Sequence, residues 1–242
     1  MGALLILLRS IAFAAFFYLW SLLIAVVMAP AMLGSGRSAL GWVRLWNSGT
    51  LFGLRAICGI EVEVRGREYI PSSGALIAAK HQCMFDAFAP LSHLSCPSLV
   101  GKQELARIPL FGWYAVRSKL MLVVDRKGHA GALRRLMAET RSALNEGRQL
   151  LIFPQGTRTP PGTHAKYKPG VAGLYRDLGV SCVPLATNAG VHWAPHGILR
   201  RPGKIVFEYL EPIPPGLARG PFMKVLEHRL EAAADALIVE RA

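Results

Sequence analysis

An uncharged apolar stretch near the N-terminus constrains this chain more than any other feature of its sequence. Residues 10–29 contain no Asp, Glu, Lys or Arg and read SIAFAAFFYLWSLLIAVVMA. As a helix, a segment of this length would be about 30 Å long, which matches the hydrocarbon core of a bilayer. We therefore expect a helix that enters a membrane between Arg9 and Pro30, either spanning it or lying re-entrant or interfacial.

Two further interpretations concern this N-terminal region. The tripeptide Ala29-Pro30-Ala31 loosely resembles a signal-peptide cleavage site, but the apolar run is too long for a secretory signal and the leader before it is not basic. Residues 39–60 carry Trp42, Trp46 and many aliphatic side chains, which predicts a second helix. This helix either lies at the membrane interface or packs on the folded domain, because an apolar face serves both purposes.

The rest of the chain alternates strand-like and helix-like segments. Residues 60–65 alternate apolar and charged side chains, as in a half-buried strand. Short apolar runs of buried-strand length occur at residues 75–79, 98–101, 121–124, 150–153, 182–186 and 205–209. The clearest helices are predicted at residues 131–146, before Gly147, and at residues 222–240. This alternation predicts an α/β fold: a mixed, largely buried sheet flanked by helices and preceded by a membrane-embedded helical segment. The anchoring helices should occupy residues 1–58 and a single folded domain residues 59–242.

Charge favours an anionic partner. The chain has 28 Lys and Arg against 15 Asp and Glu, a formal net charge of +13, which suits nucleic acid, an acidic membrane or a phosphorylated substrate. No RNP-like motif, zinc-finger spacing or dense basic block is present, so nucleic acid is not expected as a partner. The apolar segment favours lipid. Arg37, Arg44 and Arg55 follow this segment and place the domain on the cytoplasmic side of a membrane.

The cysteines and histidines indicate neither a metal nor a disulfide framework. Cys58, Cys83, Cys96 and Cys182 are scattered, with no C-x-x-C pair. The seven histidines include no H-E-x-x-H or comparable spacing. We therefore predict no metal ion and no cofactor.

A histidine and an aspartate follow the apolar run at residues 75–79, in the segment KHQCMFD. Ligands of α/β sheets usually bind beyond the carboxyl ends of the strands, where this segment should lie. His81 can take a proton from an attacking hydroxyl, and Asp86 can orient the imidazole and stabilise the imidazolium. Five residues correspond to about 140° around a helix, so the chain must turn between them for the two side chains to meet. The alternative is a structural histidine beside an aspartate that caps a helix.

Four blocks, in order, resemble the 1-acylglycerol-3-phosphate acyltransferases, the lysophosphatidate acyltransferases of phospholipid synthesis. The family's N-H-x-S-x-x-D is similar to KHQCMFD, and its G-K-x-E-L-x-x-I-P-x-F-G-W to GKQELARIPLFGW at residues 101–113, followed by VVDR ending at Arg126. Its F-P-E-G-T-R-S is similar to FPQGTRT at residues 153–159, and a V-P-V-A-like strand to VPLA at residues 183–186. Four ordered blocks over roughly residues 60–210 are more specific than any single motif.

The resemblance implies transfer of a fatty acyl group from acyl-CoA or acyl carrier protein to lysophosphatidate, giving phosphatidate. In it His81 is the general base and Asp86 its orienting partner, and Cys83 is a small packing residue. Residues 59–242 would form the catalytic domain. The protein would belong to a bacterial inner membrane, with this domain on the cytoplasmic side.

The acceptor's phosphate needs cationic side chains and backbone N–H donors. The expected phosphate-binding residues are Arg126, Arg158, Lys102, Gly156 and Thr157. Arg200 and Arg201 are expected around the mouth of the site.

Two positions depart from the family pattern. Gln155 replaces the family's glutamate and is expected to bind the acceptor, with an amide donor added and no capacity to act as a base. Lys80 replaces a frequent asparagine and either meets phosphate or is merely tolerated. These differences keep two alternatives open: an O-acyltransferase for another lysolipid such as lyso-ornithine lipid, and a non-catalytic membrane lipid-binding protein.

Overall fold

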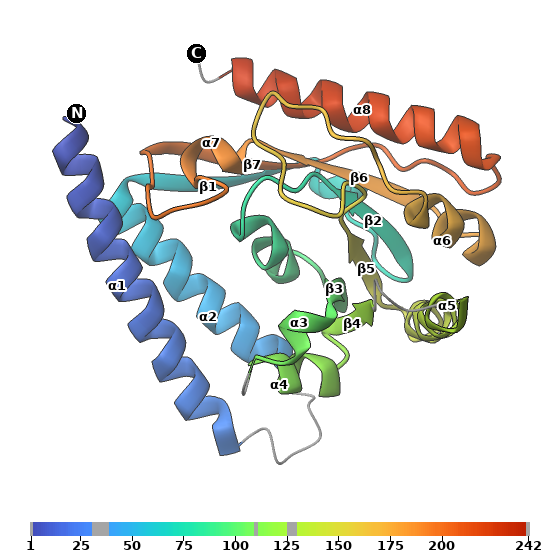
Figure 1. Cartoon of the computed structure of the whole chain (residues 1–242), viewed down its shortest axis with the longest axis horizontal. Helices are drawn as coiled ribbons and strands as arrows, with labels where there is room; N and C mark the ends of the chain where they lie inside the picture. The colour runs from blue at the N-terminus through green and yellow to red at the C-terminus, as the bar shows by residue number, and fades with distance from the viewer. Residues whose placement is uncertain (1, 31–38, 109–110, 125–129, 241–242) are drawn as a thin grey trace.

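The computed structural model describes residues 2–30, 39–108, 111–124 and 130–240. Within these residues, seven strands form one sheet in the order β1-β7-β6-β2-β5-β3-β4 (Figure 1). β6 and β7 are antiparallel and the other neighbouring pairs are parallel. The strands are β1 (Ile60–Arg65), β2 (Ala75–Ala79), β3 (Pro97–Lys102), β4 (Met121–Val124), β5 (Gln149–Ile152), β6 (Cys182–Thr187) and β7 (Gly203–Tyr209).

The predicted mixed sheet flanked by helices is confirmed. β1, β2 and β4 begin and end at the expected residues, and β5 begins at Gln149 rather than at residue 150. The run at residues 131–146 is α5 (Ala130–Asn145), and the run at residues 222–240 is α8 (Arg219–Val239). Short buried apolar runs and helix-period patterns therefore located these elements correctly.

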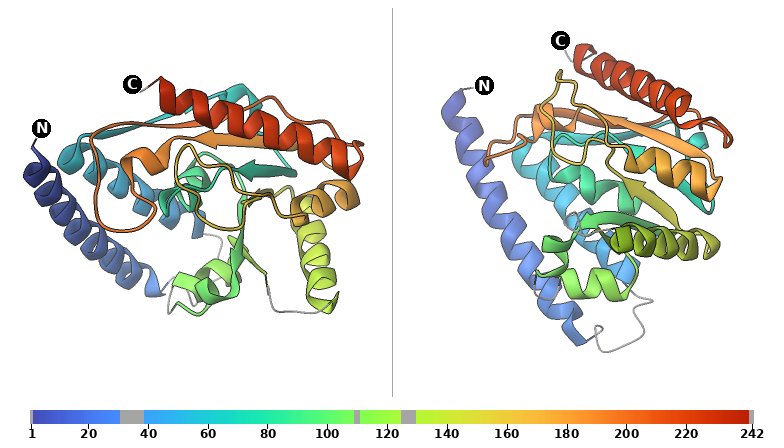
Figure 2. Two further views of the ribbon diagram at one scale, coloured as in Figure 1. Left: turned by 45° about the horizontal axis from the view of Figure 1, so that its top comes forward. Right: turned by 45° about the vertical axis from the view of Figure 1, so that its right-hand side comes forward.

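The sheet is covered on both faces, as Figure 2 shows. Along β2, Leu76 and Ala78 contribute to the core shared with α5, α8 and α6 (Gly170–Leu178). Ile77 and Ala79 point to the opposite core, which includes the N-terminal helices. Alternating side chains of a fully buried strand thus supply both cores, which explains why β2 is apolar throughout.

The first helix, α1 (Ala3–Met28), starts earlier than the expected residue 10. Arg9 lies inside the helix, because one arginine among leucines does not interrupt a helix. Within the described residues, α1 is the one helix long and apolar enough to cross a bilayer, a property that a core helix or signal sequence can share. Only 17% of its most apolar window is buried.

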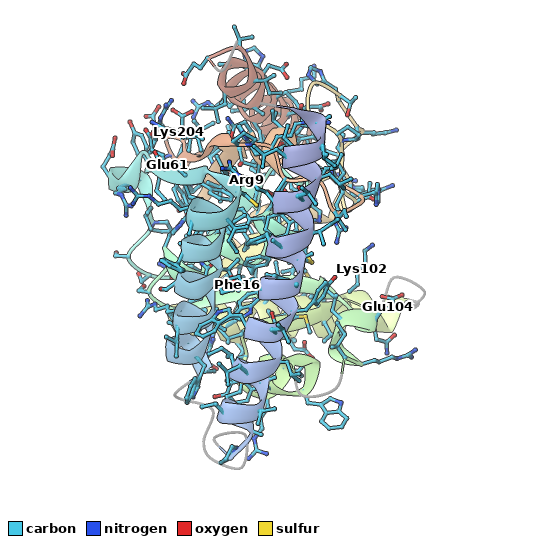
Figure 3. The ribbon with its side chains drawn as sticks, turned by 90° about the vertical axis from the view of Figure 1, so that its left-hand side faces the viewer. Arg9, Phe16, Glu61, Lys102, Glu104 and Lys204 are labelled. Atoms are coloured by element: carbon cyan, nitrogen blue, oxygen red, sulfur yellow. The ribbon has the colours of Figure 1, made fainter. Side chains whose placement is uncertain are left out.

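The second helix, α2 (Ala39–Gly53), lies beside α1 and continues as a π-helical turn, Leu54–Cys58 (Figure 3). The Trp20 indole donates a hydrogen bond to the Trp46 carbonyl at 2.8 Å, and the Trp46 indole donates to the Ser21 hydroxyl at 2.9 Å. Gly49 and Gly53 leave room on α2 for the rings of Trp20 and Phe16. The two helices therefore form a closely packed hairpin.

This hairpin is attached to the domain. Arg44 Nη2 donates to the Leu94 carbonyl at 2.9 Å, and the Asn47 amide donates to the Ala89 carbonyl at 3.3 Å. From α1, Phe13 and Phe17 are buried in the same core as Phe207 and Trp193. Of the two roles considered for residues 39–60, packing on the domain is therefore present, while Leu45 and Phe52 remain exposed.

We predict opposite effects for two glycine substitutions in α2. A Cβ at Gly49 would lie 2.3 Å from the Trp20 ring, whereas a Cβ at Gly41 meets nothing within 4 Å. Gly49→Ala should lower the free energy of unfolding by about 1–3 kcal/mol through overpacking. Gly41→Ala should raise it by about 0.5–1 kcal/mol, because alanine is the better helix former. Melting temperatures in detergent measure both, and equal shifts of the same sign would contradict the packing described.

Candidate active site

The site begins where β2 ends. The Lys80 N–H still donates to the Leu185 carbonyl of β6 at 2.9 Å. The chain then leaves the sheet and enters two short 3-10 helices, Phe85–Ala87 and Ala89–Ser92. β2 is parallel to β5 and β6, so His81 stands at the edge where the carboxyl ends of these strands meet.

His81 and Asp86 lie together across this turn. Nδ1 of His81 is 3.5 Å from Oδ2 of Asp86, an ion-pair distance, although Nδ1 makes no hydrogen bond. The Asp86 side chain is 1% exposed and the His81 side chain 15%. Asp86 Oδ2 also accepts the N–H groups of Gln82 at 2.5 Å and Cys83 at 2.7 Å. The carboxylate therefore fixes the turn and at the same time faces the buried nitrogen of the imidazole.

Cys83 is unsuited to nucleophilic attack. Its thiol is fully buried and donates to Asp86 Oδ1 at 3.4 Å. Burial and the neighbouring carboxylate raise the pKa of this thiol well above its usual value. Because the thiolate is the nucleophilic form of cysteine, a thiol kept neutral in this way is unreactive.

The loop after β5 covers His81. The Phe153 ring stacks on the imidazole with centroids 4.0 Å apart and planes inclined by 18°. The Thr159 N–H donates to the His81 carbonyl at 2.8 Å, and Gln155 Oε1 accepts the His81 N–H at 3.4 Å. Two sequence blocks about 70 residues apart are thus joined around one histidine.

Gln155 combines a structural contact with an unused donor. Its side chain is 2% exposed, and its carbonyl oxygen is directed to the His81 backbone. With the amide in this orientation, the buried Nε2 has no hydrogen-bond partner within the described structure. A buried amide donor without a partner is costly, so it is suited to an oxygen atom of a ligand.

The expected phosphate-binding residues are spread along the same edge. Arg158 is exposed and its Nη1 donates to the Pro195 carbonyl at 3.2 Å, and Thr157 beside it is exposed. Gly156 has φ 69°, and its N–H donates to the Phe153 carbonyl at 3.0 Å, so this expected phosphate donor is already engaged. Lys102 ends β3 and extends into solvent (Figure 3). Arg126 lies outside the described residues.

Residues 61–188 match the family model described as Acyltransferase, which is more than half of the 242 residues. The chain belongs to the acyltransferase family. The matched range contains His81, Asp86 and the loop at residues 153–159.

Two curated relatives of the chain carry the same name. The 1-acyl-sn-glycerol-3-phosphate acyltransferase of Pseudomonas aeruginosa is 35% identical over 163 residues, 67% of this chain and 63% of that protein. The enzyme of the same name from Borreliella burgdorferi is 26% identical over 159 residues, 65% of this chain and 63% of that protein. The chain thus spans about three-fifths of the length of these two relatives.

A solved structure extends the likeness to the fold. The 1-acyl-sn-glycerophosphate (LPA) acyltransferase of Thermotoga maritima aligns with a TM-score of 0.79 at 22% sequence identity. The alignment covers 96% of this chain and 97% of that one. At this identity, the likeness establishes the arrangement of the elements, including α1 and α2, and not the substrate.

Lys80, where the family often has asparagine, does not reach the site. Its side chain is 2% exposed, and its Nζ lies 2.5 Å from Oε2 of Glu231 on α8. Of the two roles considered for Lys80, direct contact with phosphate is therefore wrong. The signal for its partner was a glutamate among the apolar positions of α8, between Leu230 and Ala234.

An aromatic layer separates the site from α1. Phe85, next to Asp86, stacks on Trp193 with ring centroids 5.4 Å apart and planes 7° apart. Trp193 contacts Phe13 and Phe17 of α1 edge to face. In this acyltransferase-family chain, the turn that holds His81 and Asp86 is therefore supported through Trp193 by α1, its most apolar helix.

Arg200 does not line the mouth of the site, contrary to expectation. It is 8% exposed, with its guanidinium 3.9 Å from the Trp193 ring centroid, and burial lowers its pKa to about 10. Its backbone N–H donates to Ser10 Oγ of α1 at 2.8 Å. Arg200 therefore fastens α1 to the domain, while Arg201 is exposed.

The described residues hold no cluster of metal ligands, and a surface hollow among them lies away from the expected site. Among the described residues, no three His, Cys, Asp or Glu side chains come together as metal ligands. A surface hollow of about 480 Å³ is lined by Arg55, Gly59, Glu61, Gly203 and Lys204. It lies at the start of β1 and β7 and includes none of the expected site residues.

Proposed function

We propose that the chain is a 1-acyl-sn-glycerol-3-phosphate O-acyltransferase that transfers a fatty acyl group from acyl-CoA or acyl carrier protein to lysophosphatidate, giving phosphatidate. The observation that carries this proposal is the apposition of His81 and Asp86 at 3.5 Å, under the loop at residues 153–159. The shared name of the curated relatives supports the choice of acceptor.

His81 acts as the general base in this reaction. Its imidazole removes the proton from the acceptor's free hydroxyl while that oxygen attacks the thioester carbonyl carbon. The tetrahedral intermediate collapses with cleavage of the C–S bond, and the departing thiolate takes the proton from the imidazolium. Asp86, beside Nδ1, stabilises the imidazolium in between. The steps balance without a metal, a redox cofactor or an acyl-enzyme.

The acceptor's phosphate is bound by Arg158, Lys102 and Arg126, with backbone donors around Thr157. Arg158 and Lys102 are exposed at the sheet edge that carries His81, and a guanidinium matches a phosphate bidentately. Gln155 Nε2 donates to a glycerol oxygen of the acceptor, because this buried amide lacks a partner.

The hairpin lies along the membrane surface, with the catalytic domain on the cytoplasmic side of a bacterial inner membrane. One side of α1 is buried against the domain at Ser10, Phe13, Phe17 and Ile24. The other side exposes leucines, among them Leu19, Leu22 and Leu23. A helix packed on a folded domain along its length cannot be surrounded by lipid, so α1 immerses its outer face in one leaflet.

A second acceptor class stays in view because of Gln155. A neutral side chain replaces the family's glutamate beside His81, and Lys80 is engaged with Glu231 rather than with a ligand. A lysolipid without a phosphate, such as lyso-ornithine lipid, would need neither Arg158 nor Lys102.

A donor-by-acceptor activity matrix tests this proposal. Purified protein should transfer acyl groups to lysophosphatidate, and Arg158→Ala should raise the KM for lysophosphatidate about tenfold through loss of a charge-assisted contact. The matched control is Arg176→Ala, which removes an exposed arginine of α6 near the opposite edge of the sheet. Unchanged lysophosphatidate kinetics in Arg158→Ala would contradict the phosphate site, and transfer to lyso-ornithine lipid alone would favour the second acceptor.

A further inference from the structure

Lys80 and His81 leave β2 on opposite faces of the sheet. Leu76 and Ala78 point toward α8, and Lys80 continues this alternation, whereas Ile77 and Ala79 precede His81 on the other face. The Lys80 ammonium is therefore beneath the site rather than in it. Its side chain is 2% exposed, so its charge depends on a protein partner.

Glu231 supplies that partner from the middle of α8. Its Oε2 lies 2.5 Å from Lys80 Nζ, and its Oε1 accepts the Tyr167 hydroxyl at 2.7 Å. Burial and the hydrogen bond to Glu231 raise the pKa of Tyr167, so the phenol remains a donor. Both carboxylate oxygens are thus engaged, which a buried carboxylate requires. Because an unpaired buried carboxylate is costly, Lys80 and Tyr167 can take few other positions around Glu231.

Lys80 and α8 also hold the loop at residues 154–168. Lys80 Nζ donates to the Thr163 carbonyl at 3.4 Å, and His164 Nε2 lies 2.9 Å from Asp235 Oδ2, one turn after Glu231 on α8. The Lys168 N–H donates to the Pro154 carbonyl at 2.7 Å and closes the base of the loop. On the other face of β2, Gln155 and Thr159 of this loop hold the His81 backbone.

We propose that Lys80 and Glu231 are a positioning pair that fixes the loop at residues 154–168, and through it the imidazole of His81. The pair touches neither substrate, and the inference rests on the proposed function of the same site. Its importance follows from geometry, because a displacement of about 1 Å of a reacting group can cost about 100-fold in rate. The sequence block KHQCMFD alone, with lysine before the histidine, does not reveal the pairing of Lys80 with Glu231.

Kinetics of three variants test the pair. Glu231→Gln leaves the buried Lys80 ammonium without a counter-ion, and Lys80→Met leaves Glu231 Oε2 with only the exposed His164 imidazole, 3.6 Å away. Each variant should lower kcat at least about tenfold with KM for donor and acceptor within about threefold. The double variant Lys80→Met/Glu231→Gln removes both charges of the pair together, so its melting temperature should return toward that of the parent. Its kcat should stay as low as that of Lys80→Met. Recovery of kcat together with the melting temperature would reduce the pair to a stabilising role and overturn the proposal.

Hydrogen exchange supplies a readout that does not depend on the acceptor. Backbone amides of residues 154–168 should exchange faster in the double variant, while those of α5 should be unchanged. Unchanged protection of the loop overturns the positioning role even if lysophosphatidate is not the substrate. Conversely, the parent protein could be inactive on lysophosphatidate while the loop exchanges faster in the double variant. This result overturns only the proposed function and supports the positioning role. The matched control is Glu227→Gln, one turn earlier on α8 and exposed, which should leave both measurements unaltered. If a single variant does not fold, the double variant still decides.

Discussion

His81→Ala is expected to lower kcat for acyl transfer about 1000-fold while the protein stays folded. Among the described residues of the proposed site, the imidazole is the base that faces both a carboxylate and the covering loop, 3.5 Å from Asp86 and stacked on Phe153. Its removal takes away the proton acceptor and leaves the turn intact, because the turn is held by Asp86 and backbone N–H groups. Initial rates with radiolabelled acyl donor and a melting curve provide the two measurements.

Asp86 should behave differently from His81. Asp86→Asn removes the charge beside the imidazole but keeps an oxygen for the turn, so kcat should fall about 100-fold with little loss of stability. Asp86→Ala leaves the buried N–H groups of Gln82 and Cys83 unpaired, which should cost about 1–3 kcal/mol of folding free energy each. His228→Ala on the exposed side of α8 is the control for His81. A folded His81→Ala protein with more than about a tenth of parental activity would refute the general-base role.

Local pattern was sufficient for the sheet and for the turn at the site. The strands are short apolar runs between turn residues, and β2 to β7 follow that signal to within two residues at each end. The five-residue spacing of His81 and Asp86 required a turn, and a 3-10 helix beginning at Phe85 is present. Both inferences depend only on neighbours in sequence.

Two helices were misread from local signals, and the partner of Lys80 depended on tertiary contact. The start of α1 was misplaced because Arg9 was taken as a boundary, although a single charge does not end a helix. α6 was overlooked despite its own signal, with Val171, Leu174 and Tyr175 buried and Gly179 at its end. The partner of Lys80 lies 151 residues away on α8, and only the packing of α8 on the sheet joins them.

Substitutions on the outer face of α1 are expected to have a large effect on membrane binding. Leu19, Leu22 and Leu23 are 67%, 61% and 53% exposed. Their side chains can therefore contact lipid without any change in the packing of the protein core. Burial of each in hydrocarbon should contribute about 1 kcal/mol or more. The triple change Leu19→Ser/Leu22→Ser/Leu23→Ser should therefore lower partitioning into anionic vesicles about 100-fold. Vesicle flotation measures this, and activity on vesicle-embedded lysophosphatidate should fall with it while activity in detergent micelles stays within about threefold.

Deleting α1 could not make this distinction, because its inner face belongs to the domain core. Phe13 is 1% exposed and contacts Trp193, so Phe13→Ala should cost about 3–5 kcal/mol of folding free energy without any membrane present. Val239→Ser, at an exposed valine near the end of α8, is the control for the leucine changes and should leave partitioning unaltered. If the triple serine variant binds vesicles as the parent does, the lipid-facing side is elsewhere. If it instead loses activity equally in vesicles and micelles, the leucines act in folding rather than in placing His81 at the lipid surface.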